Sequence, residues 1–227
     1  MPEFTEEKGL VLSSKRLGER SCILSVLTEN NGRHLGVYQK QKPPEIGTVV
    51  SVRWRARLAE QMGTFYLEEV SSLSIPFLDD KKRLACLSAI CLLLHELLPE
   101  RQIFPNLYHS VFDFLDNLSE ADFLKRYVLL EKELLSEIGF GLDTSCCAGG
   151  GNSDDLFYIS PKTGRAVSRE KGKPYHDKLL LLPRFLWCNA DATDLDIQSG
   201  LKLTGYFLQT FALKKLLPKI REQLITF

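Results

Sequence analysis

The sequence lacks the features that would mark a membrane protein or an exported protein. None of its apolar runs approaches the roughly 20 residues that a membrane-spanning helix needs. The first four residues, Met1-Pro2-Glu3-Phe4, have neither the basic segment nor the apolar segment of a signal peptide. We therefore expect a protein of the cytoplasm that has no contact with a membrane.

The usual sets of catalytic and metal-binding residues are also missing. The four histidines are scattered without a His-x-x-x-His pair, and no glycine-rich loop leads into a helix and a lysine. The six cysteines include no Cys-x-x-Cys pair, which argues against a zinc knuckle and a secreted disulfide framework. We expect no catalytic residues, no cofactor and no structural zinc. The weakest alternative is a thiol-dependent hydrolase that uses Cys146 or Cys147 with His176.

Net charge is absent too, because 29 lysines and arginines balance 29 aspartates and glutamates, but the charges are unevenly placed. Residues 8–57 contain ten basic residues against three acids, and residues 162–184 contain seven against two. Residues 79–145 are acidic, with twelve acids against seven bases. A basic segment attracts a polyanion, and the release of counterions from its phosphates drives the association.

One basic stretch has a strict period of two. In residues 50–58 the apolar side chains alternate with Ser51, Arg53, Arg55 and Arg57, so a β-strand here would have one core face and one cationic face. Arginines two apart repeat every ~7 Å, comparable to the phosphate spacing of an extended nucleic-acid strand. The alternative is a solvated face that is charged only for solubility. We predict a nucleic-acid-binding surface built from the following cations: Lys15, Arg16, Arg20, Arg33, Lys40, Lys42, Arg53, Arg55 and Arg57.

The first third of the chain is predicted to be β-structure. Asn31-Gly32 is a strong hairpin signal, and five short strands followed by helices fit a closed barrel of the OB type. An SH3-like barrel or a plain five-stranded sheet would give the same pattern. The predicted strands are 9–14, 22–28, 33–39, 48–58 and 64–72.

Near Pro76 the hydrophobic period changes to 3.6, which predicts an α-helical second domain. Asp79 or Asp80 can cap its first helix, and Ser119-Glu120-Ala121-Asp122 has the form of a capping box. We therefore predict an α+β protein with domains 1–76 and 77–227. The predicted helices run from 79 or 80 to about 98, from about 105, from 123 to 138 and from 196 to 217, with a loop-rich insertion at 146–190 that contains a hairpin at 156–160 and 165–168.

The order of several short motifs resembles the RecO family of bacterial recombination mediators. Nearly the whole chain takes part in the resemblance. The motifs are Gly9 to Arg16, Gly18-Glu19, Ile23 to Glu29, Asn31-Gly32-Arg33 with Val37-Tyr38, His95 to Leu98, Phe123 to Tyr127 with Glu131, Gly139 to Asp143 before Cys146, and Ser160 to Ser168.

This resemblance implies an N-terminal OB barrel, an α-helical domain and a zinc-finger-like insertion. It also implies a non-enzymatic role in DNA repair and recombination by the RecF pathway, in the bacterial cytoplasm at the nucleoid. Such a protein would bind single- and double-stranded DNA, anneal strands, contact the acidic tail of the single-stranded-DNA-binding protein SSB, and act with RecR so that RecA replaces SSB. Members that bind zinc carry two cysteine pairs, which this chain lacks.

The resemblance also implies a site for the SSB tail. Lys125 and Arg126 match the family's basic pair, and Leu124 and Tyr127 can line an apolar pocket beside them. The alternative is that both cations only extend into solvent from a bundle helix. In the loop after the first hairpin, residues 38–44 keep two of the family's positive charges but lose its glycine and an arginine. A second hypothesis for the whole chain is an OB-fold adaptor that binds RNA or acts in translation.

Overall fold

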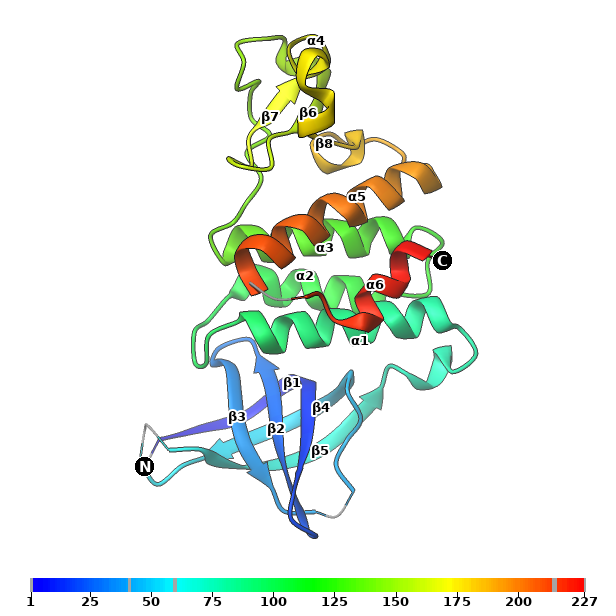
Figure 1. Cartoon of the computed structure of the whole chain (residues 1–227). Coiled ribbons are helices and arrows are strands. Elements are labelled where there is room, and N and C mark those ends of the chain that lie inside the picture. Colours follow the sequence, from blue (N-terminus) through cyan, green and yellow to red (C-terminus); the bar gives the residue numbers. More distant parts are fainter. Residues whose placement is uncertain (1, 41, 59–60, 214–215, 227) are drawn as a thin grey trace. The chain divides into compact units, whose positions relative to one another are not determined.

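The computed structural model describes residues 2–40, 42–58, 61–213 and 216–226 (Figure 1). The chain divides into two compact units, Met1–Asp116 and Asn117–Phe227, and each is described by itself. These units differ from the predicted domains, 1–76 and 77–227, because the first two helices are grouped with the barrel. Within the described ranges, none of the helices combines the length and the apolar character needed to cross a bilayer.

The first unit contains the predicted five-stranded closed barrel, with strand order β1-β2-β3-β5-β4. This order, closed by pairing of β4 with β1, is that of an OB fold. All five predicted strands are confirmed, although β1 is longer than predicted and β4 ends at Arg55, which leaves Arg57 and Leu58 of the predicted strand outside it. Their bounds are β1 Glu3–Leu17, β2 Ser21–Thr28, β3 Gly32–Tyr38, β4 Thr48–Arg55 and β5 Gly63–Ser72.

A single long strand closes the barrel by pairing on both sides. The first half of β1 pairs with β4 and its second half pairs with β2, with a register shift between Val11 and Ser13. The other closure, between β3 and β5, is a short parallel contact at Gly36 and Gly63. A Cβ at Gly63 would lie 2.3 Å from the Trp54 ring, so only glycine lets this strand approach so closely. Trp54 is itself buried in the barrel core and donates from Nε1 to the Leu35 carbonyl at 3.1 Å.

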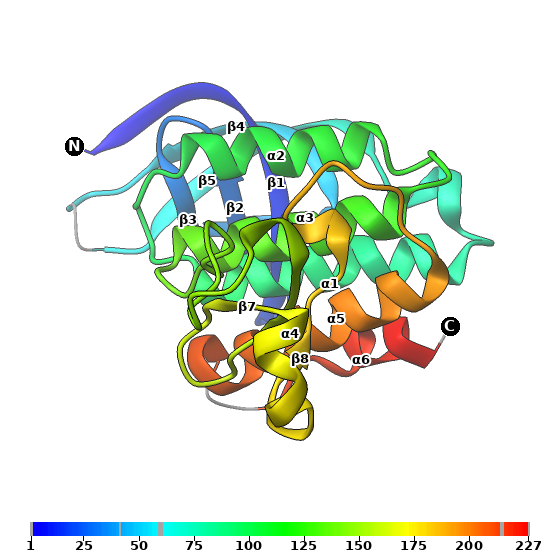
Figure 2. The ribbon, with the colours of Figure 1, turned by 90° about the horizontal axis from the view of Figure 1, so that it is seen from above.

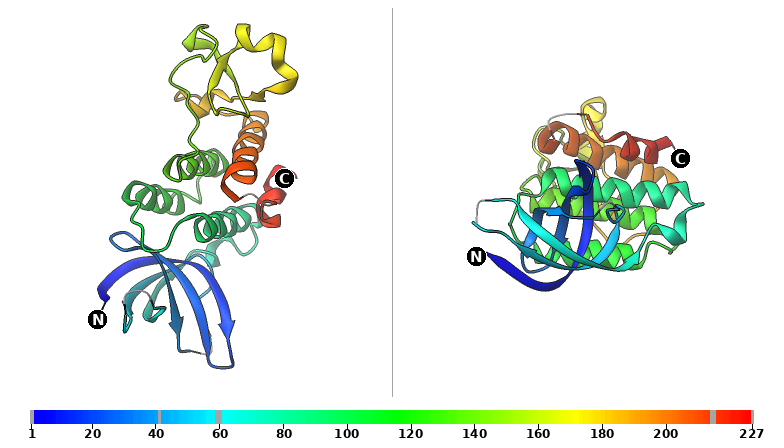
Figure 3. Two further views of the ribbon diagram at one scale, coloured as in Figure 1. Left: turned by 60° about the vertical axis from the view of Figure 1, so that its left-hand side comes forward. Right: turned by 90° about the horizontal axis from the view of Figure 1, so that it is seen from below.

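Two helices cover one end of this barrel, α1 (Lys81–Leu97) and α2 (Pro105–Asp116). As predicted, Asp80 caps α1, and its carboxylate accepts from the backbone N–H groups of Lys82 and Arg83. The Tyr108 hydroxyl of α2 donates to the Lys8 carbonyl of β1 at 3.0 Å. The turn between β1 and β2 points away from these helices, toward the viewer in the right-hand panel of Figure 3.

The second unit is built on α3 (Phe123–Glu137), α5 (Asp194–Phe207) and α6 (Lys219–Thr226). The predicted capping box before α3 is wrong, because Asp122 is the N-cap residue and its side chain makes no cap hydrogen bond. A capping box instead opens α5, where Thr193 and Asp196 bond reciprocally. The predicted fourth helix is also shorter than expected, since a π-helical segment, Leu208–Leu213, follows α5 and α6 is separate.

A buried ion pair joins the three helices of the second unit. Arg221 of α6 and Glu131 of α3 are both fully buried, and the guanidinium donates to both carboxylate oxygens at 3.0 and 2.8 Å. Thr204 of α5 donates to the same carboxylate at 2.5 Å. Burying these charges is tolerated because each has several partners.

The predicted insertion is a small three-stranded sheet of order β7-β6-β8 with a one-turn helix, α4 (Arg169–Gly172). The predicted hairpin is confirmed as β6 (Leu156–Ile159) and β7 (Ala166–Ser168), and β8 (Leu180–Leu181) adds a short edge. The insertion lies on the side of α5 opposite α6 in Figure 1, and in front of α5 when seen from above in Figure 2.

Candidate nucleic-acid interface

Eight of the nine predicted cations of the barrel are exposed. They form three groups, which we call the turn cations, the loop lysines and the β4 arginines. The turn cations are Lys15, Arg16 and Arg20, the loop lysines are Lys40 and Lys42, and the β4 arginines are Arg53, Arg55 and Arg57.

Strand pairing connects Lys15, one of the turn cations, to Arg55, one of the β4 arginines. Residues directly opposite each other in a sheet point to the same face. Following these pairs around the outside of the barrel gives one continuous row, which runs Lys15, Ile23, Val37, Thr64, Arg55. Neighbouring strands are ~4.8 Å apart, so the two ends of the row are roughly 19 Å apart along the surface.

The middle of this row is largely apolar. Ile23, Val37 and Thr64 are partly exposed, whereas Lys15 and Arg55 at the two ends are exposed. The loop lysine Lys40 follows the end of β3, and its ammonium group lies 5.6 Å from the centre of the Tyr38 ring. This contact keeps Lys40 at the same end of the barrel as the turn cations. A surface with cations on both sides of an apolar middle can hold two stretches of phosphate with bases between them.

A cavity of about 420 Å³ opens at the β4 end of the row. Tyr66 of β5 stands directly opposite Arg53 of β4, and its side chain is 56% exposed. Phe4 packs nearly parallel to Trp54, with ring centroids 5.8 Å apart. The cavity therefore combines guanidinium groups with aromatic surface and is lined by Glu3, Phe4, Arg53, Trp54, Arg55 and Tyr66.

Carboxylates from β1 and β5 reduce the positive charge of the β4 arginines. Arg55 lies 3.8 Å from Glu3, and both side chains are more than half exposed. Arg53 shares a smaller cavity, of about 70 Å³, with Glu6 and Glu68. An exposed ion pair of this kind contributes little free energy to folding and leaves the guanidinium able to bind another anion. The charge count of residues 8–57 missed Glu3 and Glu6, because it began after them.

Arg33 is the predicted cation that does not belong to this surface. Its side chain is buried, and its Nε donates to the Leu98 carbonyl at the end of α1 at 2.8 Å. Burial lowers the pKa of its guanidinium, although Glu100 and Glu96 oppose the shift. The prediction that Arg33 contacts nucleic acid is therefore wrong, since it is used in packing β3 against α1.

His34, the next residue, is buried against the rings of Phe4 and Trp54. Burial, together with the charge of Arg101, lowers the pKa of its imidazole to about 4. His34 is therefore neutral at physiological pH and adds no positive charge to the barrel.

The predicted SSB-tail residues lie on the first two turns of α3. Tyr127 is fully buried, so its predicted contact with a peptide is wrong. Leu124, Lys125 and Arg126 are partly exposed, and Arg126 Nε lies 2.9 Å from Asp122 Oδ1. These three residues remain a predicted site.

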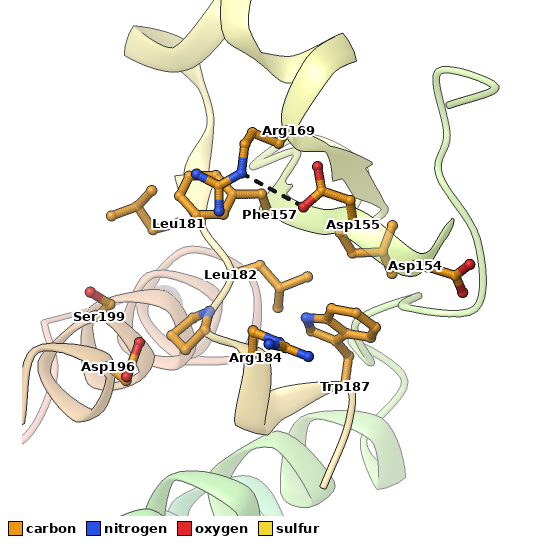
Figure 4. Close-up of a pocket in the computed structure, with 12 residues that line it drawn as sticks. Asp154, Asp155, Phe157, Arg169, Leu181, Leu182, Arg184, Trp187, Asp196 and Ser199 are labelled. Atoms are coloured by element: carbon orange, nitrogen blue, oxygen red, sulfur yellow. Dashed lines mark ion pairs between the residues drawn. The ribbon is translucent and has the colours of Figure 1, made fainter. Parts of the chain in front are cut away.

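The second unit has a cavity of its own, of about 450 Å³, between the insertion and the first turns of α5 (Figure 4). Arg169 lies over the Phe157 ring at 3.7 Å and pairs with Asp155 at 3.6 Å, the dashed contact in Figure 4. Three aspartates and two arginines line this cavity, so it does not favour a polyanion. The basic segment 162–184 brings only Arg169 and Arg184 to it.

Cys147, at the start of the insertion, is a buried thiol with several hydrogen-bond donors around it. Burial raises the pKa of this thiol, but hydrogen bonds from Ser168 and from the N–H groups of Gly151 and Gly149 outweigh burial and bring the pKa to about 7. The Ser168 N–H donates to its sulfur at 3.1 Å. In the parts of the chain that the structure describes, no group of three or more His, Cys, Asp and Glu could hold a metal ion.

Comparison with known proteins agrees with the predicted resemblance. Two family models match this chain, Recombination protein O N terminal over residues 1–73 and Recombination protein O C terminal over residues 78–217. A DNA repair protein RecO of Rhodospirillum centenum is 40% identical over 222 residues, which are 93% of this chain and 88% of the relative. A RecO of Caulobacter vibrioides is 40% identical over 231 residues, 97% of this chain and 95% of the relative. A RecO of Anaplasma marginale is 36% identical over 222 residues, 92% of each chain. The chain therefore belongs to the RecO family of DNA repair proteins.

Proposed function

We propose that this protein is a non-enzymatic recombination mediator that binds single- and double-stranded DNA and anneals complementary strands. With RecR, it helps RecA to replace SSB on single-stranded DNA, at the nucleoid in the bacterial cytoplasm. The observation that supports the DNA-binding part is the row from Lys15 to Arg55, which links one turn cation and one β4 arginine along the outer surface of the barrel.

A single strand would cross the barrel along this row. The turn cations would hold phosphates at one side and the β4 arginines at the other, while bases would rest on the partly exposed middle. A row of roughly 19 Å accommodates about three phosphate repeats of ~7 Å. Contacts to the backbone carry no sequence information, so binding to most of the strand would be independent of its sequence.

The partner contacts rest on the family resemblance. We place the SSB tail at Leu124, Lys125 and Arg126, where two cations stand beside a partly exposed apolar residue. A peptide that is acidic and ends in a free carboxylate suits such a site. Tyr127 is left out because it is buried.

The test is annealing of complementary oligonucleotides that are coated with SSB. Replacing Arg53, Arg55 and Arg57 together by alanine should slow annealing strongly. A control variant that replaces the exposed Lys173, Lys178 and Lys202 by alanine removes the same charge from the other unit and should anneal normally. Equal loss in both variants would show that net charge, and not the barrel surface, drives annealing. Competition with RNA of the same sequence would favour the RNA-adaptor hypothesis if RNA bound more tightly than DNA.

A further inference from the structure

The cavity at the β4 end of the row contains a carboxylate that binding to phosphate does not explain. Glu3 stands directly opposite Arg55 in the pairing of β1 with β4, and Glu3 Oε2 lies 3.8 Å from Arg55 Nε. A carboxylate at a phosphate site weakens binding, because like charges repel. Glu3 is 63% exposed, so neither burial nor packing requires an acid there.

The same cavity offers a flat surface for stacking. Tyr66 is more than half exposed and stands beside Arg53, while Phe4 forms part of the wall. The cavity volume of about 420 Å³ is within the range of small-ligand pockets, which is roughly 300–1,000 Å³. An exposed tyrosine between arginines on a barrel is the kind of surface on which single-stranded bases stack.

We propose that this cavity takes one nucleobase of the bound strand and discriminates between bases through Glu3. This inference rests on the proposed nucleic-acid function. The base stacks on Tyr66, its exocyclic amine donates to the Glu3 carboxylate, and a ring acceptor receives a hydrogen bond from Arg55. Glu3 and Arg55 thus present an acceptor and a donor side by side.

This arrangement suits cytosine better than thymine. The amine at C4 of cytosine can donate a hydrogen bond to a carboxylate. The neighbouring ring nitrogen, N3, is an acceptor that suits a guanidinium. Thymine has a carbonyl oxygen at the same position, so the carboxylate would face a second acceptor without a hydrogen between them. Both bases are single pyrimidine rings that can stack on Tyr66, and the C5 methyl group of thymine adds apolar contact, so a preference for cytosine would come from the hydrogen bonds. The bound strand should therefore prefer cytosine at this one position.

The experiment compares binding of labelled oligo-dC and oligo-dT of equal length by fluorescence anisotropy at pH 8. The wild-type protein should bind oligo-dC about threefold to tenfold more tightly than oligo-dT. This ratio is smaller than that of a buried base contact, because the site is exposed to water. Glu3→Gln should bring the ratio of the two affinities to about one, because an amide donates to thymine as readily as it accepts from cytosine.

Glu19→Gln is the matched control, because Glu19 is an exposed acid in the turn between β1 and β2 and loses the same charge. It should strengthen binding of both oligonucleotides alike and leave their ratio unchanged. Tyr66→Leu should weaken both, whereas Tyr66→Phe should bind like the wild type. A wild-type ratio of one, or an unchanged ratio in Glu3→Gln, would overturn the inference while leaving the proposed function intact. Failure of both oligonucleotides to bind at low salt would overturn the proposed function as well.

Discussion

Replacing the β4 arginines should change how strongly salt weakens DNA binding. Each phosphate that a single strand pairs with a cation contributes about 0.7 to the slope of log affinity against log salt concentration. Arg53 and Arg55 line the cavity and Arg57 follows β4, so the triple alanine variant removes up to three contacts. The slope should therefore become less steep by about 2.

The assay is a titration of labelled oligo-dT at several salt concentrations, because an unstructured strand avoids competing base pairs. Affinity of the variant should fall most at low salt and approach that of the wild type as salt rises, since the lost term is electrostatic. The Lys173, Lys178 and Lys202 variant should keep the wild-type slope. If the triple arginine variant also keeps that slope, the β4 arginines do not contact the strand, and the nucleic-acid interface must be sought elsewhere.

Three further predictions concern stability and the residues that the structure removes from the interface. Arg221→Met leaves Glu131 as a buried charge without its ion-pair partner and should lower the free energy of unfolding by about 3–5 kcal/mol, while the double variant with Glu131→Met should recover most of the loss. Hydrogen exchange of α3 and α5 measures the stability of each variant, and a double variant no more stable than the single variant would contradict this prediction. His34 has a pKa of about 4 in the folded protein against 6.5 in the unfolded chain, so the unfolded chain binds more protons between pH 6.5 and about 4, and the free energy of unfolding should fall by roughly 2–3 kcal/mol over this range. His34→Gln should flatten the pH dependence of urea unfolding, and an equally steep loss of stability in this variant would refute the role of His34. Arg33→Met should destabilise the first unit by about 1–2 kcal/mol through loss of the hydrogen bond to Leu98, yet leave the affinity for oligo-dT and its dependence on salt concentration unchanged. A weaker dependence on salt would show that Arg33 does contact DNA.

The local pattern of the sequence was enough to predict five strands and a charged face, but it did not distinguish an OB barrel from an SH3-like barrel or a plain five-stranded sheet. The alternation in residues 50–58 gave the correct side for Arg53 and Arg55, because a strand sends successive side chains to opposite faces wherever it lies. Arg57 lies in the bend after β4, where this rule does not apply. The caps and breaks of α1 and the hairpin of the insertion were predicted for the same local reason. What the alternation could not show is which segments lie next to each strand.

The errors concern contacts between residues far apart in the sequence. Arg33 is hydrogen-bonded to Leu98 and Arg101, and Glu3 reaches Arg55 only because the first half of β1 pairs with β4. Tyr127 was placed at the surface although it lies on the buried side of α3. The pair of Glu131 and Arg221 was missed, although a helix after Pro218 could have been predicted from the spacing of Ile220 and Leu224, which lie four residues apart.

The most direct test asks whether one DNA strand contacts both ends of the row. Photoreactive amino acids are placed at positions 23 and 64 of the same protein, the neighbours of Lys15 and Arg55 in the row, so that both cations are kept. The protein is irradiated with a labelled oligo-dT, digested and analysed by mass spectrometry. A strand that follows the row from Lys15 to Arg55 should yield one oligonucleotide joined to both peptides. Cross-links that join each peptide only to separate oligonucleotides would contradict a single path across the barrel.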